Sequence, residues 1–426
     1  MTRKTLLDVL CISVIAFLAA CIPATPDLNA TATQDALNNA ATQTAAPPPI
    51  PTPTTTTPPL PVPSEAASPT PEQLPQGPTQ LLAYISNGHL LVTDVTNGVK
   101  GGTTQYTLAG ESDQVGDLVW SPSGEFVGFV STATGTPHIF YIFALGQSSP
   151  IDLGPGSAPA WSPDSQSIAY IGGNFPDENI WVTTIENPAP RQLTFETNYA
   201  WGRPVFTPDG TSLIVAGTDR NNMGASGNTM FTLESLALDG SGTRIPLPGA
   251  TPFEGGRLPY DLRFSADGAR LAFSTSFHLS ACASPGAYYV SNPDGSNRQE
   301  LVSPSLKTAM DTNQEHYHVG LSYAWAPAGD ALVGLGNVVD CGIDSPSFGQ
   351  VIAGPQMSII GLDGSEQMII PGFFYGITMD RTGTFIAAAH HLEGFQDLVP
   401  NVEIYSAETG QLVLSLGPGS NPQFQP

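Results

Sequence analysis

Positive charge is scarce in this chain of 426 residues, where 13 lysine and arginine residues stand against 37 aspartate and glutamate residues. The formal net charge is −24, and Lys100 and Lys307 are the only lysines beyond Lys4. Binding to nucleic acid depends on basic side chains at the phosphates, so the composition excludes that class of partner. Direct docking on anionic lipid is disfavoured for the same reason.

Cysteine and short catalytic motifs are also scarce. The chain has four cysteines, of which Cys282 and Cys341 remain once the N-terminal segment with Cys11 and Cys21 is set aside. There is no Cys-x-x-Cys pair, no phosphate-binding glycine loop, no haem motif and no strict Gly-x-Ser-x-Gly elbow. These absences argue against the redox, nucleotide-binding, haem and serine-hydrolase classes that such motifs indicate.

Residues 21–79 lack the side chains that build a folded core. From Ile22 to Thr79 there is no aromatic residue, no lysine and no arginine, and proline, threonine and alanine dominate. Such a segment buries too little apolar surface to offset the entropy lost on ordering. We predict a disordered tether, and the threonine-rich run within it could carry O-linked sugar.

Residues 1–20 have the features of a targeting segment. Arg3 and Lys4 precede an apolar run, Val9–Leu18, that is too short to span a bilayer as a helix. The run ends in Leu-Ala-Ala-Cys at Cys21, which resembles the lipobox of bacterial lipoproteins. The resemblance implies a signal peptide cleaved before Cys21 and lipid on its thiol. The protein would then be extracytoplasmic and anchored to the cell membrane, or to the outer membrane of a diderm. The alternative is an ordinary secretory signal with an incidental cysteine.

A short motif recurs through the rest of the chain. Each copy has a large apolar or aromatic residue, a turn rich in proline, aspartate and glycine, and a β-prone run such as Ser167–Ile171. The copies begin at Trp120, Trp161, Phe206, Phe264, Trp325, Met379 and Phe424. Turns of this composition join antiparallel strands. A repeat several tens of residues long is typical of propellers and solenoids.

Each complete copy continues into further short strands separated by turns. After Ser167–Ile171 come Asn179–Thr183 and Arg191–Thr194, so one copy predicts a four-stranded antiparallel sheet, or blade. The last copy stops early: Gly417–Pro426 mirrors Gly154–Pro163, and no further strand follows. Residues 81–110 fit the three strands that this copy lacks. Pairing of the two ends would close a ring and remove exposed edges.

We therefore predict an all-β fold over residues 80–426, a seven-bladed β-propeller of four-stranded antiparallel blades closed by pairing of N- and C-terminal segments. The sequence Trp161–Ser165, followed by Ile168–Tyr170 and Arg191–Thr194, resembles the repeats of TolB-like β-propellers. The resemblance covers roughly residues 80–426, and the copy at Met379 departs most from it. It implies architecture more than function, because this fold hosts many roles.

Propeller topology predicts two faces. The loop face carries the connections between second and third strands and those between blades, whereas the turn face carries the short proline-aspartate-glycine turns. The longest connections are predicted on the loop face, at 218–228, 277–286, 303–320, 336–355 and 390–400, and all seven histidines map there as well. Because binding residues concentrate on loops held by a rigid scaffold, we predict the site on this face. The alternative is that these loops are simply polar and tolerate insertion.

Two histidine clusters on the loop face could bind a ligand. Alternation places His316 and His318 on one side of an extended segment that follows Glu315. The full set of candidate residues is His278, Glu315, His316, His318, His390, His391 and Glu393. Imidazole and carboxylate groups ligate zinc, manganese or iron, so a divalent metal is a possible cofactor although none is required. Ordinary hydrogen-bonded loop residues are the alternative, and the spacing does not fit a calcium-binding EF-hand.

Cys282 and Cys341 are predicted in equivalent connections of consecutive blades. Equivalent connections emerge on the same face, and an extracytoplasmic compartment permits oxidation. We therefore predict a Cys282–Cys341 disulfide.

Two functions follow from this reading. The first is a monomeric, membrane-anchored binding or scaffold module whose loop face holds an envelope protein, a peptide or a glycan. The second rests on the family resemblance, because some TolB-like propellers are polysaccharide lyases with a metal held by histidines. It implies a metal-dependent carbohydrate-active enzyme. The lack of a recognised catalytic set favours the first.

Overall fold

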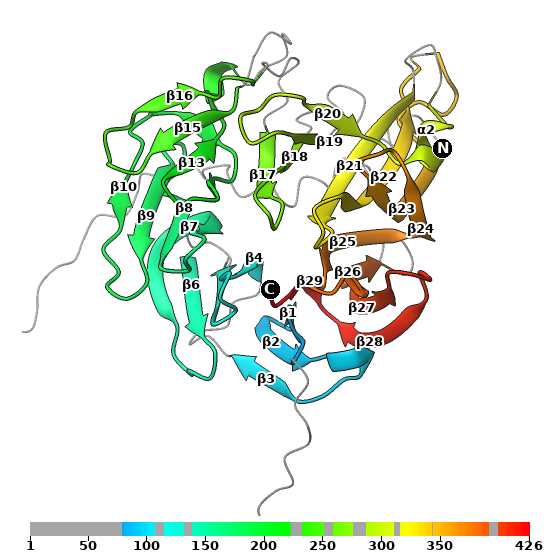
Figure 1. Ribbon diagram of the computed structural model, residues 1–426, viewed down its shortest axis with the longest axis horizontal. Coiled ribbons are helices and arrows are strands. Elements are labelled where there is room, and N and C mark those ends of the chain that lie inside the picture. Colours follow the sequence, from blue (N-terminus) through cyan, green and yellow to red (C-terminus); the bar gives the residue numbers. More distant parts are fainter. Residues whose placement is uncertain are drawn as a thin grey trace, which may run out of the picture. The chain divides into compact units, whose positions relative to one another are not determined.

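A computed structural model describes residues 79–106, 115–131, 139–222, 232–250, 259–275, 287–310, 316–342, 344–391 and 399–426. The chain divides into two units, Met1–Gly77 and Pro78–Pro426, and every described residue belongs to the second. Strands dominate this unit (Figure 1); the described helical segments are short, namely η1 (Thr96–Gly98), η2 (Arg220–Asn222) and α2 (Pro304–Lys307). Within the described parts of the chain, no helix is both long and apolar enough to cross a membrane.

The strands pair into antiparallel sheets. One four-stranded sheet has the order β29-β1-β2-β3, with β1 (Leu81–Ser86), β2 (His89–Asp94), β3 (Thr103–Tyr106) and β29 (Ser420–Phe424). A seven-stranded sheet contains β4 (Val115–Trp120), β5 (Phe126–Ser131), β6 (Ile139–Ala144), β7 (Ile151–Trp161), β8 (Ser167–Gly172), β9 (Asn179–Thr184) and β10 (Arg191–Gln192). A two-stranded sheet pairs β11 (Tyr199–Trp201) with β14 (Gly217–Asp219).

The remaining sheets have four strands each, in sequence order. The first contains β12 (Val205–Phe206), β13 (Ser212–Val215), β15 (Glu234–Ala237) and β16 (Arg244–Pro246). The second contains β17 (Pro259–Phe264), β18 (Leu271–Thr275), β19 (Tyr288–Ser291) and β20 (Gln299–Leu301). The third contains β21 (His316–Trp325), β22 (Ala331–Asp340), β23 (Val351–Gly361) and β24 (Glu366–Pro371). The fourth contains β25 (Phe373–Met379), β26 (Phe385–His391), β27 (Asn401–Ser406) and β28 (Leu412–Pro418).

The long strand β7 explains why one sheet has seven strands. Its first half pairs with β6, through Ile151, Asp152 and Pro155. Its second half, from Gly156 to Trp161, pairs with β8. Two four-stranded units therefore share one continuous strand, and none of the described sheets closes on itself.

The two ends of this unit share a sheet, as the truncated last repeat predicts. β29 pairs antiparallel with β1, with Phe424 opposite Leu82 and Gln423 opposite Ala83. The indole Nε1 of Trp120 on β4 donates to the carbonyl oxygen of Gln423 at 2.9 Å. The C-terminal strand thus lies between β1 and the first strand of the following sheet.

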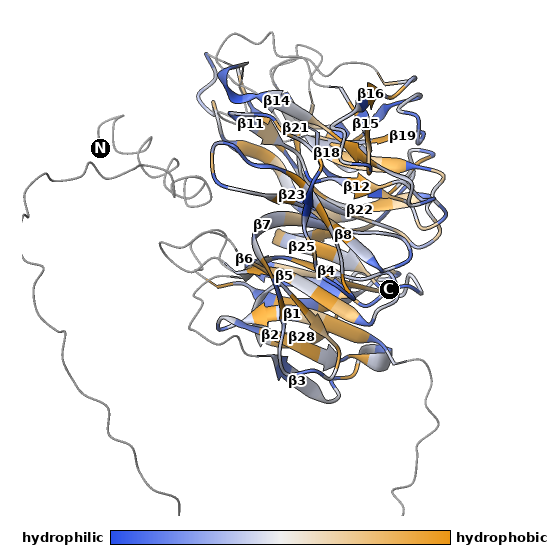
Figure 2. Cartoon of the chain, turned by 90° about the vertical axis from the view of Figure 1, so that its left-hand side faces the viewer, coloured by the Kyte–Doolittle hydropathy of each residue, from blue (hydrophilic) through white to orange (hydrophobic). Residues whose placement is uncertain are grey.

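Apolar clusters fill the spaces between neighbouring sheets, and hydrophobic residues run along the strands in Figure 2. Successive side chains of a strand point to opposite faces, so the second strand of each sheet contributes to two clusters. In β8, Ile168 and Tyr170 pack toward β5, whereas Ala169 and Ile171 pack toward β13. The clusters join β1 to β5, β5 to β8, β8 to β13, β13 to β18, β18 to β22, β22 to β26 and β26 to β1.

Several segments predicted as loops are instead partly strand. β21 begins at His316 and β22 runs to Asp340, so parts of 303–320 and 336–355 belong to a sheet. All ten residues of β22 are buried, including Val338 and Val339 in its extension. Burial of this apolar run stabilises the longer pairing. β26 similarly extends to His391, which was expected in a loop.

Candidate functional site

His316 faces a buried carboxylate at the end of the β21–β22 extension. It lies opposite Asp340 in the register, with Nε2 3.9 Å from Asp340 Oδ1 and Nδ1 3.1 Å from the carbonyl oxygen of Ala309. Asp340 also accepts hydrogen bonds from the hydroxyls of Ser345 and Ser347, and these bonds lower its pKa to about 2. The carboxylate is therefore ionised at neutral pH. It binds the hydroxyls of the β22–β23 connection and so holds that connection against β22.

His390 belongs to a second polar set, between β26 and β27. Its Nδ1 lies 2.7 Å from Glu403 Oε2, and the hydroxyl of Tyr405 donates to the same carboxylate. The imidazole stacks on Phe374 with 4.5 Å between ring centroids. Burial, reinforced by the bond to Glu403, raises the pKa of Tyr405, so its hydroxyl stays protonated and available as a donor. Glu403 is 5% exposed, and His390 and Tyr405 provide hydrogen-bonding partners for its buried carboxyl group.

The two predicted histidine clusters lie on different sheets, because His316 is on β21 and His390 and His391 are on β26. His391 contacts Tyr375 edge-on, with 5.2 Å between ring centroids. Among the described residues, no three His, Cys, Asp or Glu side chains are placed to hold a metal ion.

Other predicted site residues lie outside the described part of the chain. They are Cys21, His278, Cys282, Glu315, Glu393 and the side chain of His318. Cys341 directly follows β22, but its predicted partner is among these residues. The lipidation, the disulfide and the metal-binding role therefore stay predictions.

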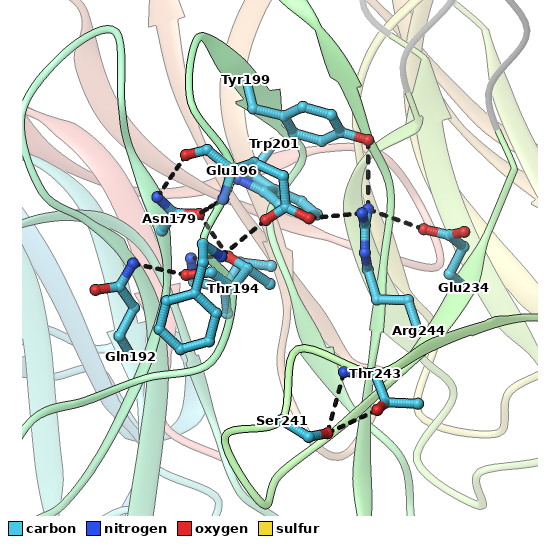
Figure 3. A network of polar contacts seen from close by, with 12 residues as sticks. Asn179, Gln192, Thr194, Glu196, Tyr199, Trp201, Glu234, Ser241, Thr243 and Arg244 are labelled. Atoms are coloured by element: carbon cyan, nitrogen blue, oxygen red, sulfur yellow. Dashed lines mark hydrogen bonds and ion pairs between the residues drawn. The ribbon is translucent and has the colours of Figure 1, made fainter.

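A network of polar side chains fixes the segment that follows β10 (Figure 3). The buried amide of Asn179 accepts hydrogen bonds from the Thr194 hydroxyl at 2.9 Å and from the Glu196 backbone N–H at 3.0 Å. The Glu196 carboxylate pairs with Arg244 at 2.6 Å, and Arg244 also pairs with Glu234 at 3.2 Å. These contacts connect β9 to the β12–β16 sheet and fix the position of Glu196 between them.

Next to this network lies an exposed aromatic ring, and we call Phe175, Glu178, Asn198 and Arg220 the Phe175 patch. Phe175 is 56% exposed, and the Arg220 guanidinium lies 4.6 Å from its ring centroid. Arg220 is held by Glu178 at 2.6 Å, and its backbone N–H donates to the Asn198 carbonyl at 2.8 Å. The ring is therefore presented to solvent beside an arginine that one ion pair and one backbone hydrogen bond hold in place. Sequence reasoning missed this patch because its members come from three non-repeating connections.

A partly buried ion-pair set links the first strands of two separate sheets. Arg203 Nη2 lies 2.6 Å from Asp117 Oδ1 on β4, and its Nε lies 3.6 Å from Asp261 Oδ1 on β17. Arg263 Nη2 pairs with Asp261 Oδ2 at 3.0 Å, so two arginines balance two aspartates. Burial disfavours the charged form of Arg203, but the two carboxylates outweigh it and the net shift of its pKa is upward. The set joins the sheets of β4 and β17 through Arg203, which lies between β11 and β12.

Sequence reasoning missed the ion-pair set although part of its signal is visible. Asp117 and Asp261 each stand three residues before the aromatic residue that begins a repeat turn, Trp120 and Phe264. Both have positive φ, 48° and 50°, where the strand bulges toward Arg203. Asn and Asp are enriched among non-glycine residues in this conformation. No sequence pattern indicates Arg203 as their partner.

No family model matches the sequence, and no curated protein matches it. Solved structures do resemble its fold. An oligogalacturonate lyase in complex with manganese aligns with a TM-score of 0.50 and 13% identity, over 79% of this chain and 83% of the lyase. TolB from Acinetobacter baumannii aligns with a TM-score of 0.42 and 14% identity, over 82% of each chain. The oligogalacturonate lyase of Vibrio parahaemolyticus aligns with a TM-score of 0.49 and 12% identity, over 80% of this chain and 85% of the lyase. At such identities the likeness concerns the fold alone, and the alignment with the manganese-bound lyase supports a β-propeller fold for this chain.

Proposed function

We propose that this protein is a membrane-anchored, extracytoplasmic β-propeller that binds an envelope protein, a peptide or a glycan through its loop face. The observation that carries the binding role is the Phe175 patch. Aromatic and arginine side chains dominate binding energy at interfaces, especially where the scaffold holds them in place. Phe175 combines an exposed ring with an arginine already fixed by Glu178.

The proposed scaffold is a closed ring of seven blades. Its support is the cycle of apolar clusters through β1, β5, β8, β13, β18, β22 and β26 and back to β1. Counting β7 as shared between two blades gives seven four-stranded units from the described sheets. In such a ring each blade contacts only its neighbours, which leaves the loop face free for a partner.

Site-specific photo-crosslinking tests the binding face. Benzoylphenylalanine would replace Phe175 in one version of the full-length protein and Phe195 in another, and membranes would be irradiated. Phe195 is the matched control because it is 60% exposed but outside the patch. We expect a discrete adduct from position 175 and none from position 195. Because Phe195 lies on the same face, equal adducts at both positions, or none at 175, would contradict the Phe175 patch as the binding site.

The enzyme alternative has a separate test. The purified protein would be incubated with manganese and oligogalacturonate, the substrate and metal that name one of the structural neighbours. Under the binding proposal, oligogalacturonate is not cleaved, and His316→Ala leaves metal content unchanged. Cleavage that depends on manganese and on His316 would show that the protein is an enzyme and would contradict the binding proposal.

A further inference from the structure

The turn face has its own hollow, where one repeat departs from the others. In three turns a hydroxyl pairs with a carboxylate two residues later, each at 2.6 Å: Ser162 with Asp164, Thr207 with Asp209 and Ser265 with Asp267. The equivalent positions before β22 are Ala326 and Ala328. This turn therefore lacks both polar side chains and presents methyl groups and Pro327 instead.

A second small residue deepens the hollow. The first residue of the second strand faces the end of the first strand in the next sheet. Phe126 fills this space by stacking on Trp161 at 5.7 Å between centroids, and Phe385 packs into the cluster that holds Phe424. β22 begins with Ala331, so the space beside Met379 stays open.

The resulting groove has a volume of about 1060 Å³. It runs from the β17–β18 turn across the β21–β22 turn to the β25–β26 turn, and Ala326, Ile359 and Ala407 are buried at its floor. A smaller hollow of about 520 Å³ lies where Ser167 takes the place of Phe126, beside Phe206. Both hollows are thus lined by a small side chain at this repeat position, Ser167 in one and Ala331 in the other.

The rim of the groove is acidic. Asp267, Asp330, Asp363 and Glu408 line it, and the one lining arginine, Arg270, donates to the Asn292 side chain. Hydrogen bonds from Ser265 and Ser365 lower the pKa of Asp267 and of Asp363, so both are ionised at neutral pH. An apolar floor beneath several carboxylates is complementary to a segment with small apolar side chains and lysine or arginine.

We propose that this groove binds an extended, lysine- or arginine-bearing segment of another protein. The chain's own tether does not supply such a segment, because Ile22–Thr79 contains no lysine or arginine. A second copy is disfavoured by the net charge of −24. The groove lies on the face opposite the Phe175 patch, so this second binding surface is independent of the proposed loop-face function.

Fluorescence anisotropy with the full-length protein tests the groove. The probe is a labelled peptide of alternating lysine and alanine, and a glutamate–alanine peptide is its control. Ala331→Phe introduces the residue that β5 and β26 carry at this position, and should weaken binding at least about ten-fold by filling the groove. The exposed double variant Asp330→Asn with Glu408→Gln should weaken binding about three- to ten-fold. Glu125→Gln removes the charge at the position equivalent to Asp330 in another turn, and should change nothing.

Several outcomes would overturn the proposal. They are no binding of the lysine–alanine peptide, equal binding of the glutamate–alanine peptide, and unchanged affinity in the Asp330/Glu408 variant. An effect of Glu125→Gln as large as that of Asp330→Asn would mean general charge attraction rather than a groove. If Ala331→Phe does not fold, the Asp330/Glu408 variant and its Glu125 control decide the matter. The loop-face crosslink from position 175 is expected in every groove variant, so failure of one proposal leaves the other standing.

Discussion

The C-terminal strand should be essential to the stability of the whole unit. Phe424 on β29 is 5% exposed and packs in the cluster that joins β1 to β26. Replacing it with alanine removes most of a buried aromatic side chain where both ends of the chain meet. The change leaves a cavity beside Leu82 and Val402, which belong to the same cluster.

The structure sets the expected magnitude. A buried Phe→Ala substitution costs about 3–5 kcal/mol in unfolding free energy. Deleting residues 421–426 also removes the Trp120–Gln423 bond of 2.9 Å, the Gln425–Gly124 bond of 2.8 Å and the Gln425–Leu81 bond of 2.9 Å. At about 1 kcal/mol for each bond, the deletion costs about 6–8 kcal/mol. That loss is comparable to the total stability of many domains, so the deleted protein should unfold or open the proposed ring.

Urea unfolding followed by tryptophan fluorescence measures the effect, because Trp120 donates to β29. Leu412→Ala is the matched control: the side chain is 53% exposed on β28, and the change should stay within about 0.5 kcal/mol. Removing residues 22–79 should also leave the unfolding midpoint unchanged. If Phe424→Ala costs no more than Leu412→Ala, closure through β29 does not hold the unit together.

Three further predictions concern single groups. Asp340→Asn should lower the unfolding free energy at neutral pH. Because the folded-state pKa of about 2 lies below the ordinary value, this stabilisation is present above about pH 4 and is lost as the pH falls through about 2; urea unfolding at several pH values should show the gap between wild type and variant closing, and a constant gap would contradict the assignment. Peptide mass mapping without reduction should recover Cys282 linked to Cys341, whereas two free thiols would exclude the disulfide. Cys21→Ala should abolish labelling by a palmitate analogue and release the protein from membranes; a variant that stays bound would show that the cysteine is not the anchor.

The fold could be predicted from the repeats because each turn is specified by residues close together in sequence. Asp209 and Asp267 accept bonds from their own turn residues, and Gly210 and Gly268 take φ values of 70° and 69° there. Such chemistry depends on neighbours in sequence, so a single copy specifies its turn. The length of β22 could not be predicted from local sequence in this way. Its extension through Val338 is stabilised by burial against β21 and β23. The length of an insertion in the sequence does not distinguish a loop from a longer strand.

The candidate sites were harder to predict for a related reason. The histidines were chosen by residue type and predicted face, yet His316 and His390 each lie beside a carboxylate on the neighbouring strand. The Phe175 patch depends on Arg220 reaching across from another sheet. The Arg203 set likewise joins residues far apart in sequence. Contacts of this kind depend on how the sheets pack against each other, so a local sequence pattern does not predict them.

A repeat protein nevertheless offers a sequence signal for one kind of site. Every copy has to form the same turn, and most copies stabilise it with the same polar side chains. A copy without those side chains forms its turn without their hydrogen bonds. Ala326 and Ala328 are two such losses in one copy, and they coincide with the larger groove on the turn face, which the small Ala331 also lines. If Ala331→Phe abolishes peptide binding while leaving the fold intact, the small side chains of this copy serve to make room for the ligand. If the variant is more stable and peptide binding is unchanged, the alanines reflect relaxed packing, and departures from the repeat do not mark a binding surface in this fold.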